Sequence, residues 1–306
     1  MSASIEKIKD FLNADPFVLD GGMGTLLEQR GIDVNNPMWS ATALVESPDA
    51  IRQAHLDYYR AGARIGISAS YQASFEGFAA AGFSREQTEK LMRLSVQLAR
   101  EARDEHGSGL VAASVGPYGA MLADGSEYRG DYGLSATELR DWHLERMRVL
   151  ASAGPDIFAV ETIPAIAEIG GIVDALDQLD TPAWISVTVN SGRLPTGESL
   201  ESAFELAATS DRVVAIGINC SYPAEVTGAL IAARKVTDKP FIAYPNSGEL
   251  WDAKNHTWVG APDIPGNLVE EWLHLGITAI GGCCRVDPDE ISHISKIVAE
   301  WNQITL

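Results

Sequence analysis

The sequence predicts an α/β protein folded as a closed (β/α)8 TIM barrel, and three observations lead to this class. Eight short apolar runs, rich in β-branched residues, recur along the 306 residues. Segments with apolar residues at helical spacing separate them, which is typical of a parallel sheet with right-handed crossovers. The glycine-rich turn Asp20–Gly24 lacks the G-x-G-x-x-G spacing of dinucleotide-binding sheets, so an open doubly wound sheet is the less favoured arrangement.

The strand candidates are these apolar runs, each bounded by polar residues or glycine. They are Phe17–Asp20, Arg64–Ser70, Leu110–Val115, Ile157–Glu161, Trp184–Val189, Val213–Asn219, Phe241–Tyr244 and Ala279–Gly282. Strand–helix units in this number fit one closed barrel, so we expect a single domain over residues 1–306.

Helices are expected between the strands, and four segments show the apolar spacing most clearly. They are Arg85–Glu105, Ala136–Ala153, Ala224–Lys235 and Leu268–Leu275. After the last strand, Asp287–Trp301 begins with an aspartate suited to the N-cap and a proline at the first helical position. Met1–Asn13 is predicted as a short amphipathic helix that lacks the apolar core of a secretory signal.

Composition and charge exclude several classes of partner. The formal net charge is −19, whereas nucleic acid and anionic membranes attract basic surfaces. No run approaches the roughly 20 apolar residues of a membrane span. We therefore expect a cytoplasmic protein with small-molecule partners, no nucleic-acid or membrane partner, and a monomeric or weakly homo-oligomeric state. Its three cysteines should be reduced in that compartment.

Polar side chains gather where the predicted strands end, and in a barrel these ends meet at one mouth. The residues at the strand ends are Asp20, Ser70 and Tyr71, Gly116 to Tyr118, Glu161 and Thr162, Asn190, Asn219 and Cys220, Tyr244 to Asn246, and Cys283 and Cys284. Residue types that bind metals and substrates therefore meet at this mouth. The pattern predicts an active site there.

The three cysteines, Cys220, Cys283 and Cys284, all follow predicted strands and should converge at the mouth. Free cysteines are often small buried hydrophobes, and a disulfide is a further alternative that adjacent cysteines form poorly. Three thiolates suit Zn²⁺, and no fourth cysteine is left to close the site. The six histidines fall in or near helices and loops, so we expect an open fourth position, which is typical of catalytic zinc.

With these motifs the chain resembles the homocysteine S-methyltransferase family. The resemblance rests on Asp20-Gly21-Gly22 after the first strand, Gly217-Ile-Asn-Cys220 after the sixth and Gly281-Gly-Cys-Cys-Arg285 after the eighth. Three further stretches, Ser114–Ala120, Leu122–Asp131 and Tyr244–Glu249, resemble the subgroup that uses S-methylmethionine as methyl donor. The resemblance to the family covers nearly the whole chain.

The resemblance implies that Cys220, Cys283 and Cys284 hold the zinc and act in catalysis. A sulfonium donor, S-methylmethionine or S-adenosylmethionine, would then methylate a zinc-bound homocysteine thiolate to give methionine. Free homocysteine thiol has a pKa of roughly 8.5, and zinc removes its proton. Thiolate and sulfonium combine into two neutral thioethers, so a dry site favours the reaction.

Six other residues are expected to bind the substrates. By resemblance to the betaine-dependent enzyme, Asp20 and Glu161 contact the homocysteine amino group, although each could instead cap a helix or accept backbone hydrogen bonds. Tyr71 is expected near the vacant zinc position or the donor, and aromatic faces attract cations. The full expected set is Asp20, Glu161, Tyr71, Asn219, Tyr118 and Asn246.

Three other functions stay open. The acceptor could be selenocysteine or another thiol, or the chain could be a non-catalytic zinc or thiol-binding barrel. A barrel lyase or aldolase with incidental cysteines would need a Schiff-base lysine, and no lysine stands at a predicted strand end. Among donors, we expect S-methylmethionine to outperform S-adenosylmethionine and betaine to be negligible, because no motif obviously accommodates an adenosine.

Overall fold

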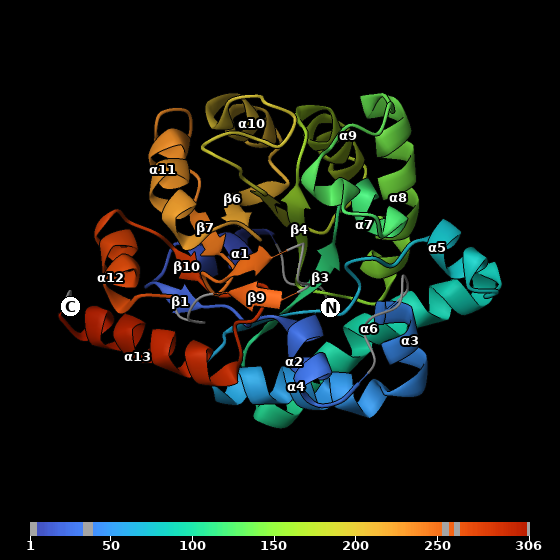
Figure 1. Cartoon of the computed structure of the whole chain (residues 1–306), viewed down its shortest axis with the longest axis horizontal. Coiled ribbons are helices and arrows are strands. Elements are labelled where there is room, and N and C mark those ends of the chain that lie inside the picture. The colour runs from blue at the N-terminus through green and yellow to red at the C-terminus, as the bar shows by residue number, and fades with distance from the viewer. Residues whose placement is uncertain (1–4, 33–38, 253–256, 260–263, 305–306) are drawn as a thin grey trace.

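The protein is a barrel of eight strands surrounded by helices (Figure 1). The computed structural model describes residues 5–32, 39–252, 257–259 and 264–304. The strands pair in the order β1-β10-β7-β6-β5-β4-β3-β2, and all seven ladders are parallel. A parallel bridge from Leu19 to Ile65 joins the two ends of this order. The ring is therefore closed, and the predicted fold class is confirmed.

All eight predicted strands are present in the barrel. They are β1 (Phe17–Val18), β2 (Ile65–Ile67), β3 (Leu110–Val115), β4 (Ile157–Ile163), β5 (Ala183–Val187), β6 (Val213–Asn219), β7 (Phe241–Tyr244) and β10 (Ala279–Ile280). Two short strands, β8 (Leu250–Asp252) and β9 (Thr257–Val259), form a separate antiparallel pair that the sequence did not predict.

The predicted helices are confirmed with small shifts at their ends. The described helices are α1 (Ile5–Leu12), α2 (Met23–Gln29), α3 (Trp39–Glu46), α4 (Pro48–Arg60), α5 (Phe75–Ala80), α6 (Arg85–His106), α7 (Tyr118–Leu122), the 3-10 turn η1 (Ser126–Tyr128), α8 (Ala136–Ser152), α9 (Ile166–Leu176), α10 (Leu200–Ala207), α11 (Pro223–Arg234), α12 (Gly266–His274) and α13 (Pro288–Ile304). Capping boxes at Ser84 and Ser135 satisfy the first amides of α6 and α8 and so define where these helices begin. The first four residues of the expected N-terminal helix lie outside the described residues.

The apolar core consists of two clusters, and their positions determine which end of the barrel is left for the site. Between the strands and the outer helices lies a large apolar cluster that includes Phe158, Val160 and Trp272. A second cluster fills the barrel interior around Trp184 and contains Ile8 and Leu12 of α1. The apolar face of α1 thus packs into the ring and leaves the opposite, carboxyl ends of the strands for the site. Among the described helices, none is long and apolar enough to cross a membrane.

Candidate active site

A cavity of about 320 Å³ opens at the carboxyl ends of the strands. Seven of the eight barrel strands, or the loops after them, contribute to its lining. The polar residues and cysteines that line it are Asp20, Thr25, Glu28, Ser68, Tyr71, Gln72, Ser114, Glu127, Tyr128, Glu161, Thr162, Asn219, Cys220, Tyr244, Cys283 and Cys284. Among the described residues in this lining there is no lysine, arginine or histidine. The cavity therefore presents negative and sulfur-containing groups.

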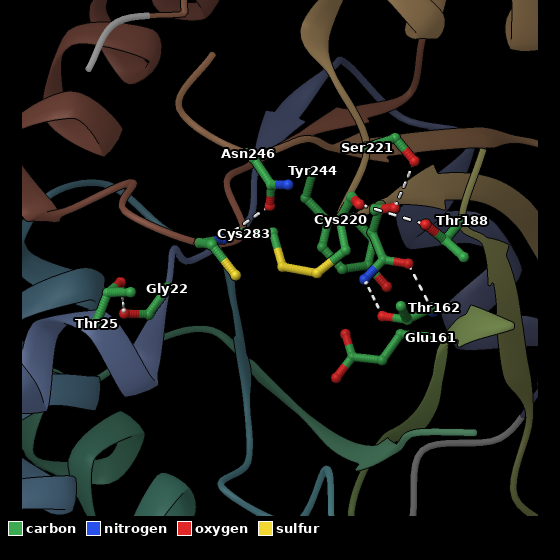
Figure 2. The surroundings of a disulfide bond; sticks show 12 residues. Gly22, Thr25, Glu161, Thr162, Thr188, Cys220, Ser221, Tyr244, Asn246 and Cys283 are labelled. Carbon is green, nitrogen blue, oxygen red and sulfur yellow. Dashed lines mark hydrogen bonds between the residues drawn. A yellow bond between two sulfur atoms is a disulfide. The ribbon is translucent and has the colours of Figure 1, made fainter. Parts of the chain in front are cut away.

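The three cysteines meet in this cavity. Their Sγ atoms all lie within 4.8 Å of one another, close enough for one metal ion to reach all three. Cys220 and Cys283 are joined by a disulfide (Figure 2) with a Cα–Cα distance of 5.5 Å. Cys284 is a free thiol. The expectation of three reduced cysteines is corrected here. Adjacent cysteines pair poorly, whereas the barrel brings the ends of β6 and β10 close enough for Cys220 and Cys283 to bond.

The end of β7 holds the backbone of all three cysteines. The amides of Cys220 and Cys283 donate to the carbonyl oxygens of Tyr244 (3.4 Å) and Pro245 (2.7 Å). The amide of Cys284 donates to the side-chain oxygen of Asn246 (3.2 Å). Asn246 does not line the cavity. Asn246 therefore supports the backbone of the cysteine loop from outside the cavity. This contact gives the Tyr-Pro-Asn sequence at the end of β7 a structural role, although that strand carries no cysteine.

The donor set fits a soft metal ion such as zinc. Three sulfur atoms from two loops are gathered at one point, and the open cavity lies beside them. Burial raises the pKa of the Cys284 thiol to about 11, so this cysteine is protonated at neutral pH until a cation displaces its proton. The disulfide must be reduced before Cys220 and Cys283 can contribute thiolates. Metal binding here therefore requires a reduced protein and releases protons.

Asp20 and Glu161 lie in the same cavity, near enough for the Glu161 carboxylate to raise the pKa of Asp20. Burial is the main reason that the pKa of Asp20 is well above its usual range, although a 2.6 Å hydrogen bond from the Ile67 amide to Oδ2 opposes it. Burial also raises the pKa of Glu161 to about 7, against hydrogen bonds from Ser114 and Tyr244. Two buried carboxyl groups with high pKa values favour a cationic ligand, which stabilises their ionised forms.

Asn219 is buried and joins the ends of β4 and β6. Its side-chain oxygen accepts from the Thr162 amide (2.6 Å), and its side-chain nitrogen donates to the Thr162 hydroxyl (2.8 Å). Thr162 and Cys220, the residue after Asn219, both have positive φ, 64° and 46°. Residues other than glycine rarely adopt this backbone conformation. The amide of Asn219 thus stabilises the turn from which Cys220 points into the cavity, in addition to lining it.

The two expected tyrosines differ in position. Tyr71 lines the cavity, and burial raises its pKa well above the usual range. Tyr118 does not line it. The Tyr118 ring packs against Tyr132 and Trp142, with centroids 5.3 and 5.1 Å away.

Several lining residues were not predicted from the sequence, among them Gln72, Glu127 and Tyr128. Gln72 follows Tyr71, and the other two lie in η1, inside the Leu122–Asp131 stretch that resembles one subgroup of the family. That resemblance was the available signal. It did not identify individual residues, because a loop without periodic spacing gives no indication of which side chains face inward.

Known proteins are similar to this chain in sequence and structure over most of its length. The family model described as Homocysteine S-methyltransferase matches residues 17–298. Homocysteine S-methyltransferase 2 of Zea mays is 45% identical over 300 residues, which cover 91% of this chain and 88% of that protein. Selenocysteine methyltransferase of Astragalus bisulcatus is 41% identical over 329 residues and 97% of each chain.

Solved structures of the homocysteine methyltransferase MmuM from Escherichia coli are also similar. Its metallated form is 40% identical, has a TM-score of 0.84, and the match covers 95% of this chain and 99% of that one. Its oxidized form is 40% identical with a TM-score of 0.83, over 95% and 97% of the two chains. The match extends over the strands that carry all three cysteines, and the chain belongs to the homocysteine S-methyltransferase family.

Proposed function

We propose that this chain transfers a methyl group from a sulfonium donor, S-methylmethionine in the first place, to the thiol of homocysteine, giving methionine. We infer that its metal is zinc. The observation that carries the proposal is the convergence of three cysteine Sγ atoms within 4.8 Å in a cavity lined by carboxylates. A thiol acceptor favours the soft metal, and the sulfonium of the donor and the ammonium groups of both amino acids favour the negative lining.

Cys220, Cys283 and Cys284 would hold the zinc once reduced. Zinc bound there would act as a Lewis acid that lowers the pKa of the acceptor thiol. Asp20 and Glu161 bind the α-ammonium group of homocysteine and so orient its thiol toward the cysteines. The high pKa values of both carboxyl groups support this role, because an ammonium ion repays the cost of ionising them in a buried place.

The donor is assigned on charge and size. A cavity without basic residues in its described lining attracts a sulfonium and repels anionic methyl donors. Its volume of about 320 Å³ lies near the lower end of the roughly 300–1,000 Å³ range of ligand sites. Such a space suits two small amino acids better than one amino acid and an adenosine. S-Methylmethionine is therefore favoured over S-adenosylmethionine.

The reaction balances without a further reagent. The acceptor sulfur, having lost its proton, forms a bond to the donor methyl carbon, and the bond from that carbon to the sulfonium sulfur breaks with its electron pair. Homocysteine and S-methylmethionine each become methionine. Charge disappears in this step, so residues that exclude water from the cavity favour it. The chain's main contribution is to hold the two sulfur atoms and the methyl carbon in line.

The decisive assay measures methionine formation by the reduced, zinc-loaded protein with homocysteine and each donor at equal concentration. We expect the fastest reaction with S-methylmethionine, a slower one with S-adenosylmethionine and a negligible one with betaine. Protein treated with a chelator serves as the matched control and should be inactive until zinc is restored. Preference for betaine, or no reaction with either sulfonium, would refute the donor assignment.

Selenocysteine is a second candidate acceptor, which the 41% identity to a selenocysteine methyltransferase favours. Competition between the two acceptors at equal concentration distinguishes them, and we expect methionine to be the main product. Because thiolate ligands need a reducing compartment, we also propose a cytosolic location.

A further inference from the structure

Two oxygen atoms in the cavity are buried and accept no hydrogen bond from any described residue. They are Oε2 of Glu127 and the side-chain oxygen of Gln72. Both residues line the cavity, and only 9% of the Gln72 surface is exposed. Buried polar atoms in native proteins are normally paired, because a lost hydrogen bond in a dry place is costly. Two such acceptors in one cavity point to a ligand that donates hydrogen bonds.

The two acceptors are attached to the same short helix. The side-chain nitrogen of Gln72 donates to the carbonyl oxygen of Ala120 in α7 (3.1 Å). On the same helix, a Cβ added to Gly119 would lie 2.4 Å from the backbone nitrogen of Glu127, so η1 is in direct contact with α7 there. Gln72 and Glu127 therefore belong to one side of the mouth, which we call the α7 wall (Gln72, Glu127 and Tyr128).

The other two carboxylates discussed above differ from Glu127 in this respect. Asp20 accepts from the Ile67 amide, and Glu161 accepts from the Ser114 hydroxyl. Those carboxylates are partly satisfied by the barrel itself. Glu127 Oε2 has no such partner among the described residues, and burial raises the pKa of Glu127. Its ionised form gains most from a positively charged ligand.

The α7 wall lies beside the reacting centre. The charge of Glu127 acts on both Cys284 and Tyr71, which line the same cavity. A ligand bound to Glu127 and Gln72 thus lies in the same cavity as the cysteine cluster. A sulfonium carries no hydrogen on its charged atom, so it could not satisfy two oxygen acceptors. A primary ammonium carries three donors and one positive charge.

We propose that Glu127 and Gln72 bind the α-ammonium group of the methyl donor, and that they make the enzyme selective for donors with an amino-acid head group. This inference rests on the proposed function, since it requires a sulfonium donor at this site. Glu127 supplies the opposite charge, Gln72 the second acceptor, and the Tyr128 ring lines the same wall. The acceptor's ammonium group is left to Asp20 and Glu161 on the barrel strands.

The test compares two donors in two proteins. The donors are S-methylmethionine and 4-(dimethylsulfonio)butanoate, which is the same sulfonium without the amino group. In the Glu127→Gln variant we expect kcat/KM for S-methylmethionine to fall about 10- to 100-fold, as for a lost hydrogen bond between charged groups. The value for the analogue should change by less than about twofold, because its binding never used the carboxylate.

Matched controls separate this effect from loss of structure or charge. Asp131→Asn removes an exposed carboxylate four residues away and should leave the ratio of the two donors unchanged. Gln72→Met should lower the same ratio by a smaller factor, about 3- to 10-fold for a neutral acceptor. In all variants, zinc content and KM for homocysteine should stay as in the wild type.

The outcomes are distinguishable. If wild-type protein does not use S-methylmethionine at all, the proposed function has failed. If the wild type is active but Glu127→Gln slows both donors equally, or neither, the ammonium assignment is overturned. A rise in the KM for homocysteine without a change in the donor ratio would assign Glu127 to the acceptor and also overturn it.

Discussion

Two walls of the same mouth are built on opposite principles. On the cysteine wall, which comprises Cys220, Cys283, Cys284 and Asn246, each cysteine amide donates to residues 244–246 at the end of β7. On the α7 wall, Gln72 and Glu127 each keep a buried oxygen without a described partner. A metal ion needs ligands fixed before it arrives, whereas an exchanging substrate needs groups left unsatisfied until it binds. The residues of the cysteine wall therefore build the metal site, whereas those of the α7 wall recognise the exchanging ligand.

The largest effect is expected on the cysteine wall. Replacing Cys220, Cys283 or Cys284 by alanine should abolish metal binding and lower kcat by at least about 10³-fold, since the acceptor thiol loses its activation. The fold should persist, because neither of the two apolar clusters that form the core includes a cysteine. For each variant, metal analysis measures zinc content, steady-state kinetics measure kcat, and circular dichroism measures whether the fold persists. Full zinc and full turnover in all three variants would refute the metal site.

A smaller effect is expected from the residue that supports this wall. Asn246→Ala removes the acceptor for the Cys284 amide and should weaken zinc binding about 10- to 100-fold, as for other groups that orient metal ligands. Turnover at saturating zinc should be largely retained. Competition with a chelating dye gives the affinity. Unchanged affinity would mean that the cysteine loop holds its shape without this side chain.

Glu161 lines the same cavity and should confer a pH dependence. Its pKa is raised from 4.5 to about 7, so the carboxyl group is neutral below that pH and charged above it. Since only the charged form attracts the ammonium of homocysteine, kcat/KM for homocysteine should decrease as pH falls through 7. Glu161→Gln should lower this value about 10- to 100-fold at pH 8.

The Glu161→Gln variant also provides the control for this pH dependence. Its loss at pH 8 should shrink at pH 6, where the wild-type carboxyl group is mostly protonated. Zinc content is measured at both pH values to separate this effect from metal release. An equal loss at both pH values would show that Glu161 does not titrate in this range.

The smallest effect is expected at Tyr118. Its ring packs on Tyr132 and Trp142 and does not line the cavity, so Tyr118→Phe keeps its packing and should change kcat/KM for either substrate by less than about twofold. Kinetics with S-methylmethionine measure it. A large loss for the donor alone would return Tyr118 to the donor site and weaken the contrast between the walls.

The sequence predicted the barrel and the meeting of the cysteines because both follow from periodic patterns. Alternating strands and helices define the ring, and a ring forces the residues after β6 and β10 toward one mouth. It could not tell which aromatic of the 116–132 loop faces inward, since that loop has no repeating spacing. It also could not show that Asn246 holds Cys284 from outside the cavity. Such contacts depend on turns whose direction only the packed structure fixes.

The closure of the barrel has a consequence for substrate binding. The seam between β1 and β2 is closed by the bridge from Leu19 to Ile65, and the amide of Ile67, two residues further along β2, donates to the carboxylate of Asp20. A side chain thus continues the ladder where backbone pairing stops. Because the same carboxylate is assigned to the ammonium of homocysteine, occupancy of the site is coupled to the integrity of the seam. Hydrogen exchange at the Ile67 amide should therefore slow when homocysteine binds, so exchange at the β1–β2 seam measures occupancy of the site.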